Sequence, residues 1–103
     1  MADKELVLTG KQKRYLRGLG NALDAIVQVG KGGIVPALVD QTRDAIEARE
    51  LIKVRVLNNC LDDRKEVAKL LSERSSSALV QVLGRTFLLY RPSSKDSKIQ
   101  LPE

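Results

Sequence analysis

The stretch AIVQVGKGGIVPALVDQTRDAIEARELIKVRV, residues 25–56, decides the fold. It opens with a short β-branched run, passes through a glycine-rich turn, and continues from Pro36 with apolar residues at helical spacing. Residues 51–56 then alternate from Ile52 onward, with Ile52, Val54 and Val56 on one side and Lys53 and Arg55 on the other. This order predicts a strand, a tight loop, a helix and a second strand with one buried face and one exposed basic face.

Further elements are predicted on both sides of this stretch. Thr9 and Gln12 have the spacing of a capping box, which begins a helix over residues 11–19. Asp63 with Glu66 can cap a third helix, whose inward face is formed by Val67, Ala68, Leu70 and Leu71. A turn at Gly84-Arg85 joins two final strands. The chain therefore reads α-β-α-β-α-β-β. This predicts an α/β fold with a mixed four-stranded sheet and helices mainly on one face.

Length and composition restrict the protein further. With 103 residues, 43% hydrophobic and 30% charged, the chain is expected to form one globular domain. Histidine is absent and Cys60 is the single cysteine, which excludes a histidine base, a His-containing or four-Cys zinc site and an intrachain disulfide. The expected parts are an N-terminal extension over residues 1–7, a folded domain over 8–92 and a polar C-terminal tail over 93–103.

The N-terminal residues and the short apolar runs indicate where the protein acts. No apolar run exceeds four residues, so we expect no membrane span, and MADKELVLTG lacks the apolar core of a signal peptide. We therefore expect a cytoplasmic protein in a reducing environment.

Positive charge is concentrated near the N-terminus. The chain has 18 Lys and Arg against 13 Asp and Glu, a net charge of +5, and a sequence pI near 9.6. Five cations lie in the first helix and the glycine loop, with Asp24 as the one acid among them: Lys11, Lys13, Arg14, Arg17 and Lys31. The acids gather instead on the outer face of the helix after Pro36, at Asp40, Asp44, Glu47 and Glu50. Such separation creates a local field that favours an anionic partner.

The loop Gly30-Lys31-Gly32-Gly33 carries the most information about chemistry. Glycines between a strand and a helix allow positive φ angles and close approach of a ligand, and the helix presents its free amides to an anion. The spacing fits neither a Walker loop nor a dinucleotide fingerprint, but it fits the two-spacer loop with which KH-type domains clamp a nucleotide backbone. A plain strand-to-helix turn is the alternative.

Other candidates are weaker. Lys53, Arg55, Arg85 and Arg91 either extend an RNA-binding surface or are ordinary outward-facing residues. Tyr15 has helical spacing with Leu16 and Leu19, which predicts core packing rather than base stacking. Phe87 and Tyr90 fall on opposite faces of the last strand. Because no pair of stacking aromatics is evident, recognition of backbone and shape is the expected mode.

An enzyme is disfavoured. Asp62 and Asp63 are better explained by helix capping than by a carboxylate pair, and Cys60 has no histidine to activate it. We expect Cys60 to be a half-buried thiol near a strand end. No catalytic residue, metal, cofactor or small-molecule substrate is expected.

Four segments together resemble a known family. LTGKQKRYLRGLGNAL, VQVGKGGIVPALV, ELIKVRV and VQVLGRTFLLYRP, in this order, are similar to the bacterial YhbY family of stand-alone CRM domains, named for chloroplast RNA splicing and ribosome maturation. The resemblance spans about residues 8–92 and extends to KIQLP in the tail. It implies an RNA-binding fold related to the C-terminal domain of a bacterial translation initiation factor, with a KH-like loop.

The resemblance also implies a site and a partner. Gly30, Lys31, Gly32 and Gly33 would occupy the family's RNA-contacting loop, and the four cations of residues 11–17 its basic first helix. The implied partner is ribosomal RNA or a particle on the way to the large ribosomal subunit. Two positions depart from the family pattern: Gly20-Asn21 replaces Ala-His, and Val35 replaces a threonine N-cap.

The sequence is consistent with two candidate functions. The first is a monomeric, non-catalytic RNA-binding protein of large-subunit assembly, in which the glycine loop and the basic first helix lie side by side and form one cradle for a polyanion. The second is a protein-interaction module or translation-associated adaptor that uses the acidic face of the helix after Pro36.

Overall fold

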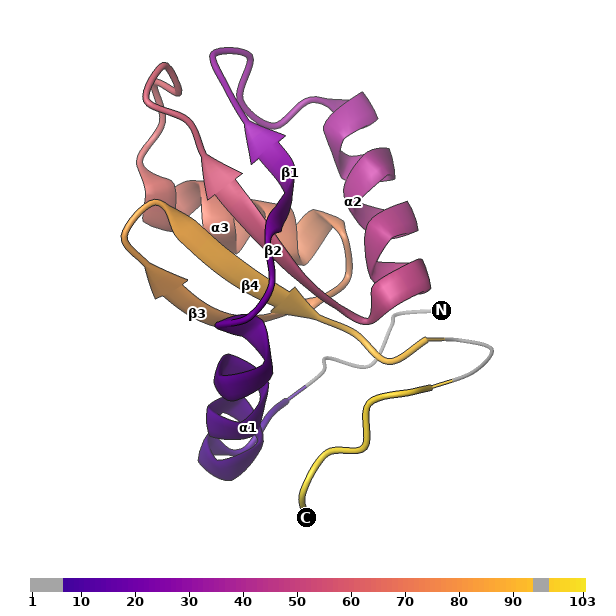
Figure 1. The fold of residues 1–103 in the computed structure, drawn as a ribbon. Helices are drawn as coiled ribbons and strands as arrows, with labels where there is room; N and C mark the ends of the chain where they lie inside the picture. Colours follow the sequence, from indigo (N-terminus) through magenta and orange to yellow (C-terminus); the bar gives the residue numbers. More distant parts are fainter. Residues whose placement is uncertain (1–6, 94–96) are drawn as a thin grey trace.

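The computed structural model describes residues 7–93 and 97–103. Within them the predicted order of helices and strands is confirmed (Figure 1). The elements are α1 (Gly10–Gly20), β1 (Ala25–Val29), α2 (Pro36–Arg49), β2 (Leu51–Val56), α3 (Arg64–Arg74), β3 (Ala78–Leu83) and β4 (Thr86–Tyr90). The boundaries agree with expectation because each is marked by a local signal, such as a cap, a glycine turn or Pro36 at the start of α2.

The four strands form one mixed sheet in the order β1-β2-β4-β3. β1 and β2 are parallel, and β4 lies between β2 and β3 and runs antiparallel to both. The hairpin turn is made by Gly84 at φ +60, a conformation in which glycine is favoured. The expected mixed four-stranded sheet is thereby confirmed.

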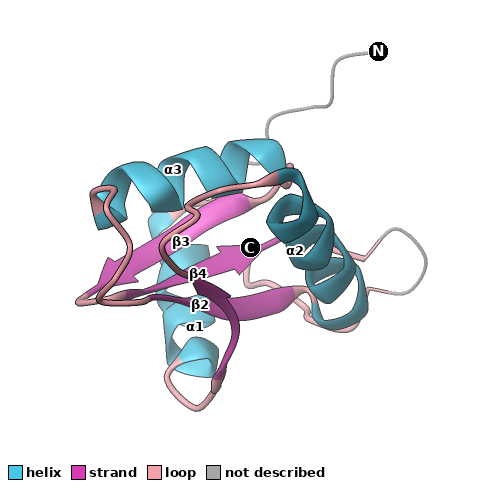
Figure 2. Cartoon of the chain, turned by 90° about the horizontal axis from the view of Figure 1, so that it is seen from above, coloured by secondary structure: helices cyan, strands magenta, loops and turns pink. Residues whose placement is uncertain are grey.

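Both faces of the sheet carry helices, two on one face and one on the other (Figure 2). α2 and α3 cover the face formed by residues such as Val27, Val54 and Phe87. α1 packs on the opposite face, where Leu16 meets Leu88 and their buried neighbours. The central strands β2 and β4 are therefore buried on the side of α2 and α3, and on the opposite side they are buried where α1 and its neighbouring residues cover them.

Helix α1 contacts the sheet through a narrow seam. Leu16 and Gly20 are buried, and a Cβ on Gly20 would collide with the side chain of Leu88. Tyr15 and Leu19 are 43% and 39% exposed, so the prediction that Tyr15 packs in the core is wrong. The apolar residues Tyr15, Leu16 and Leu19 predicted the buried face of the helix. In the structure the close approach at Gly20 turns the side with Leu16 and Gly20 toward the sheet, and this leaves Tyr15 and Leu19 at its exposed edge.

Two further residues differ from expectation. Leu70, predicted to face inward from the third helix, is 38% exposed, because α3 buries only Val67, Ala68, Leu71 and Ser72. Asp63 caps α3 as predicted and accepts hydrogen bonds from the amides of Lys65 and Glu66. The helix start is therefore set by its cap, whereas its orientation is set by packing.

Glu50 is the most buried acid among the described residues, with 1% of its surface exposed, so it does not belong to the outer acidic face of α2 as predicted. It ends α2 at φ +66, and its carboxylate holds the C-terminal tail. The carboxylate accepts hydrogen bonds from the amides of Ser93, Lys98 and Ile99 and from the Ser97 hydroxyl. Burial alone would raise the pKa of Glu50, but these hydrogen bonds outweigh it and lower the pKa below its ordinary value of 4.5.

The tail thus packs against the domain. Ile99 and Leu101 join the cluster beneath α1, and the Gln12 side chain donates to the Pro102 carbonyl at 3.1 Å. Tyr90 belongs to the same cluster, where burial, with the Glu50 charge as a second cause, raises the pKa of its phenol above the ordinary 10.0. The tail, which was expected to be polar, therefore contains two apolar residues, Ile99 and Leu101, that pack against the domain.

Candidate nucleic-acid interface

The glycine loop is a tight turn at the end of β1. The Gly33 amide donates to the Gly30 carbonyl at 3.0 Å, and Gly33 takes φ +68. Lys31 and Gly32, at the tip, are exposed. Because an L side chain at Gly33 would be strained, the loop needs glycine there for its shape, whereas Gly32 leaves the tip bare.

The side of the loop that faces α3 is acidic. A Cβ on Gly33 would lie 3.0 Å from a carboxylate oxygen of Asp62, in the loop that precedes α3. A cavity of about 310 Å³ lies there, lined by Gly32, Ile34, Asp62, Glu66, Val67, Leu70 and Arg74. The two carboxylates of this cavity outnumber its one cation, Arg74, so a phosphate is favoured at the exposed tip of the loop, at Lys31 and Gly32. The proximity of Asp62 was not predicted, and nothing in the spacing of the sequence signals it.

Helix α2 begins next to the loop without a side-chain cap. Val35 is its N-cap and makes no side-chain hydrogen bond, and Pro36 follows. The first backbone amides of α2 therefore receive no hydrogen bond from the side chain of the N-cap residue. This agrees with the departure noted at Val35 and leaves the positive end of the helix dipole near the loop.

The four cations of α1 are available to a partner. Lys11, Lys13 and Arg14 are exposed and Arg17 is half-buried. In the part of the chain that the structure describes, none of them lies within 4.0 Å of a carboxylate, and the first turn of α1 holds no acid. Their charges are therefore not neutralised locally.

The glycine loop and α1 do not adjoin. α1 precedes β1 and the loop follows it, so the two lie at opposite ends of this strand (Figure 1). A five-residue strand spans about 15 Å. The prediction of one cradle made by the loop and the helix side by side is wrong in this respect, because a strand separates them.

A bare part of the sheet lies between them. One row across the four strands, which we call the open row, runs Gln28, Arg55, Thr86, Leu83. These residues alternate with those buried beneath α2 and α3, so they point to the face on which α1 packs. Gln28, Arg55 and Leu83 are exposed, whereas Leu88, in the neighbouring row, is buried in the cluster that includes Leu16 of α1. The helix thus covers one part of this face and leaves the open row uncovered.

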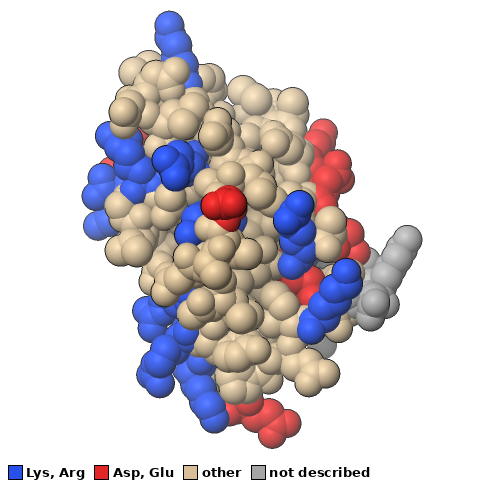
Figure 3. Space-filling view, viewed as in Figure 1, with Lys and Arg blue, Asp and Glu red and all other residues tan. Residues whose placement is uncertain are grey.

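The open row lies between the two ends of a basic surface. Figure 3 looks onto this face, and Lys and Arg side chains follow one of its sides from α1 up to the loops at the opposite end. Most acidic side chains lie on the other side, over α2, but one lies in the middle of this face and one at its lower end. We call the following residues the basic strip: Lys11, Lys13, Arg14, Arg17, Lys53, Arg55, Arg85 and Lys31. Lys53 is half-buried beside α1 and Arg85 is exposed at the hairpin turn.

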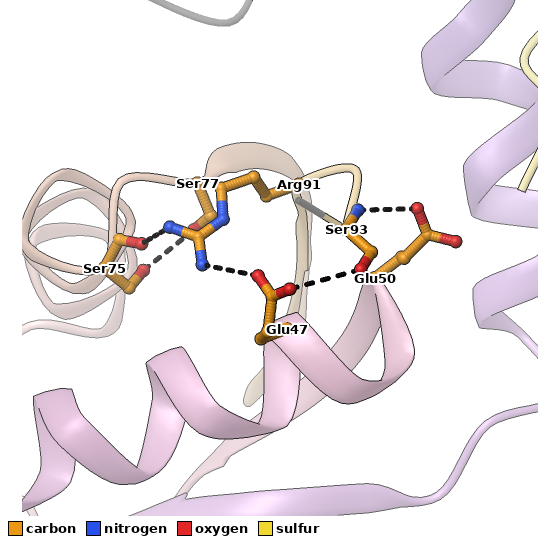
Figure 4. A network of polar contacts seen from close by, with 6 residues as sticks. All are labelled: Glu47, Glu50, Ser75, Ser77, Arg91 and Ser93. Atoms are coloured by element: carbon orange, nitrogen blue, oxygen red, sulfur yellow. Dashed lines mark hydrogen bonds and ion pairs between the residues drawn. The ribbon is translucent and has the colours of Figure 1, made fainter. Parts of the chain in front are cut away.

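Arg91 has a different role. One nitrogen of its guanidinium donates to the Ser75 carbonyl at 3.1 Å, and another lies 3.7 Å from the Glu47 carboxylate (Figure 4). Glu47 also accepts from the Ser93 hydroxyl. Arg91 thus joins the end of α3 to α2 and the chain after β4, and the structure assigns it to the fold rather than to the basic strip.

Neither a metal-binding cluster nor a membrane-spanning helix is found among the described residues. Within residues 7–93 and 97–103 no three Cys, Asp or Glu side chains gather in a way that could hold a metal ion. Every helix in that part of the chain is too short or too polar to cross a bilayer. Cys60 is half-buried, as predicted, and its Sγ lies 3.9 Å from the Asp62 carbonyl.

Comparison with known proteins identifies similar sequences over nearly the whole chain. The model of the CRS1 / YhbY (CRM) domain family matches residues 8–91. The "Probable RNA-binding protein YqeI" of Bacillus subtilis (strain 168) is 50% identical over 96 residues, which are 93% of this chain and all of that protein. An "RNA-binding protein" of Haemophilus influenzae is 34% identical over 95 residues, covering 92% of this chain and 95% of the relative.

A solved structure has the same fold. The solution structure of protein SAV1595 from Staphylococcus aureus superposes with a TM-score of 0.79 at 53% sequence identity. The match covers 93% of this chain and 100% of that one. The arrangement of helices around the sheet is therefore shared with an experimentally determined relative.

Proposed function

This chain belongs to the CRS1 / YhbY (CRM) domain family, and from that premise we propose that it is a non-catalytic RNA-binding protein. It acts on precursor RNA of the large ribosomal subunit during assembly of that subunit. The names of its relatives, which describe RNA-binding proteins, support the RNA partner. The ribosomal precursor rests on the family resemblance of the four motif segments.

The observation that carries the proposal is the basic strip beside an uncovered sheet face. Cations at α1 attract the RNA backbone and hold it by charge, and the open row lets the strand lie against the sheet. At the other end the loop tip, with Lys31 and the bare Gly32, grips a phosphate. The long strip suits contact with an extended length of backbone better than with a compact ligand.

The remaining features of the proposed function follow from this mode of binding. Backbone contacts need neither a cofactor nor a catalytic group, and no small-molecule substrate is required. The protein works as a monomer in the cytoplasm, bound to ribosomal RNA or to a pre-ribosomal particle.

The alternative is a protein-interaction module that uses the acidic face of α2, but two acids of that face are engaged within the fold. Glu47 pairs with Arg91 and Glu50 is buried against the tail, which leaves Asp40 and Asp44 as the acids on that face. Capture of partners from cells, followed by nuclease treatment, separates the two functions. Partners released by nuclease support RNA binding, and partners that remain bound support the adaptor.

The glycine loop is tested by charge reversal. We expect the double variant Lys31→Asp, Gly32→Asp to bind ribosomal RNA fragments more weakly. The slope of log affinity against log salt should fall in magnitude by about 0.7 for each phosphate of a single strand that the loop no longer binds. The measurement is a binding titration at several salt concentrations. Gln41→Asp with Arg43→Asp makes the same charge change on exposed positions of α2 and serves as the control. Equal affinity and slope for wild type and loop variant would reject the loop assignment.

A further inference from the structure

Tyr15 is the one exposed aromatic side chain among the described residues. Phe87 and Tyr90 are 1% and 2% exposed, whereas Tyr15 is 43% exposed on α1. Leu19, one turn further along the helix, is 39% exposed. Because residues four apart share a helix face, the two side chains form a small apolar surface in contact with solvent.

Gly18 lies on the same side of α1, three residues after Tyr15. A Cβ at this position would find no atom of the protein within 4 Å, and Gly18 is not among the glycines with positive φ. Neither packing nor backbone conformation therefore demands glycine here, although glycine weakens a helix relative to alanine. Its effect is to leave the helix surface flat beside the Tyr15 ring.

Two cations border this flat surface. Lys11 lies one turn before Tyr15 on the same face, and Arg14 flanks it on the outer side of the helix; both are exposed. Apolar area of this kind, bordered by cations, is complementary to a nucleotide, which combines an aromatic face with a phosphate. A protein partner would have to bring an acidic apolar surface of matching shape to a patch of only two exposed apolar side chains.

We propose that Tyr15, Gly18 and Leu19 form a platform on which one unpaired base of the bound RNA stacks. The inference rests on the proposed function and extends it. The base lies against the tyrosine ring over the bare helix at Gly18, and its flanking phosphates face Lys11 and Arg14. Since every base has a π-face, the platform tolerates any sequence but requires a base that is free of its duplex. The protein should therefore prefer single-stranded RNA at α1.

Substitution of Tyr15 tests the stack directly. The probes are a single-stranded oligoadenylate of about ten nucleotides and an RNA hairpin duplex with the same number of phosphates. Tyr15→Ala should weaken oligoadenylate binding roughly 5- to 150-fold without change in the salt slope, and leave duplex binding unchanged. Tyr15→Phe should retain wild-type binding. Arg14→Gln should instead lower the slope by about 0.7.

The two glycines of α1 provide a second test that a folding defect cannot imitate. Gly18→Ala and Gly10→Ala both replace a glycine whose Cβ would meet open space, and Gly10 lies on the far side of the helix from Tyr15. Gly18→Ala should raise the midpoint of thermal unfolding by about 3–8 °C and yet weaken oligoadenylate binding. Gly10→Ala should leave that binding unchanged.

A spectroscopic measurement completes the experiment. The chain has no tryptophan and only two tyrosines, of which Tyr90 is buried, so quenching of tyrosine emission by oligoadenylate reports on Tyr15. Strong quenching supports the stack. Wild-type affinity in both Tyr15→Ala and Gly18→Ala overturns it, and in that case a lowered slope in Arg14→Gln would leave the proposed function intact. A wild-type protein that binds neither RNA probe would overturn both.

Discussion

Asp62 places a carboxylate beside the loop that is proposed to hold a phosphate. Its oxygen lies 3.0 Å from the position of a Cβ on Gly33, and the residue itself is exposed. The sequence indicates Asp62 only as part of a helix start, because the neighbour in space, Gly33, is 29 positions away in the chain. The approach of two such loops depends on the sheet that brings the strand ends together.

The variant Asp62→Asn removes this charge and retains the shape of the side chain. We expect RNA binding to become about threefold tighter at low salt. The reason is that the Asp62 carboxylate no longer repels an RNA phosphate held at the loop, roughly 6 Å away across water. The gain should vanish as salt is raised. Titration with a ribosomal RNA fragment at two salt concentrations measures it, with Asp44→Asn on the outer face of α2 as the control. Weaker binding by Asp62→Asn would mean that the carboxylate contacts RNA or supports the loop.

At the scale of single elements, the helices and strands were predicted because their signals are local. The capping box at Thr9 and Gln12 is present with both hydrogen bonds, at 3.0 and 3.1 Å. The alternation in β2 gave the correct buried side, with Val54 fully buried. The spacing of apolar residues in the sequence does not show which of them touches the sheet. Tyr15 is an example, because it has helical spacing with Leu16 and Leu19 but is exposed. Gly20 sets the contact of α1, and its role depends on Leu88 in a distant strand.

We therefore expect replacement by alanine to change the stability of the protein in opposite directions at Gly18 and Gly20 of α1. Gly20→Ala should destabilise the protein by about 1–3 kcal/mol, because the new methyl group overlaps the buried side chain of Leu88. Gly18→Ala, whose methyl group points into open space, should stabilise it by up to about 1 kcal/mol. Urea unfolding monitored by circular dichroism measures both. A stable Gly20→Ala variant would show that α1 can move away from the sheet at little cost.

At the scale of the whole molecule, Glu50 joins the two covered faces of the sheet. It ends α2 on one face, while the tail that its carboxylate holds inserts Ile99 and Leu101 beneath α1 on the other. The sequence presents Glu50 as one of several acids on an amphipathic helix. Its burial could not be predicted, because the donors that compensate for burial come from backbone amides more than 40 positions away, and backbone donors carry no residue signature.

The lowered pKa of Glu50 makes stability depend on pH in a defined direction. Because the folded protein holds this carboxylate more acidic than the unfolded chain does, the unfolded state binds the proton more readily. The contribution of Glu50 is therefore complete above about its ordinary value of 4.5 and is lost as the pH falls through the folded pKa. We expect urea unfolding to show a steep loss of stability in this acidic range. Glu50→Gln should be less stable at neutral pH by about 1–3 kcal/mol, because its NH2 group would replace one accepting oxygen and face N–H or O–H donors. Its acid dependence should be flatter.

Removal of residues 97–103 provides the matched comparison for this prediction. The truncation takes away the Ser97, Lys98 and Ile99 donors but leaves the carboxylate, so the pKa of Glu50 should rise because these hydrogen bonds, which lower it, are lost. Stability should then fall at neutral pH rather than only in acid. Combined with Glu50→Gln, the truncation should cost less than the sum of the two separate changes, because both remove the same hydrogen bonds. Additive losses would place the stabilising effect of the tail in Ile99 and Leu101 alone and would leave Glu50 without a role in holding it.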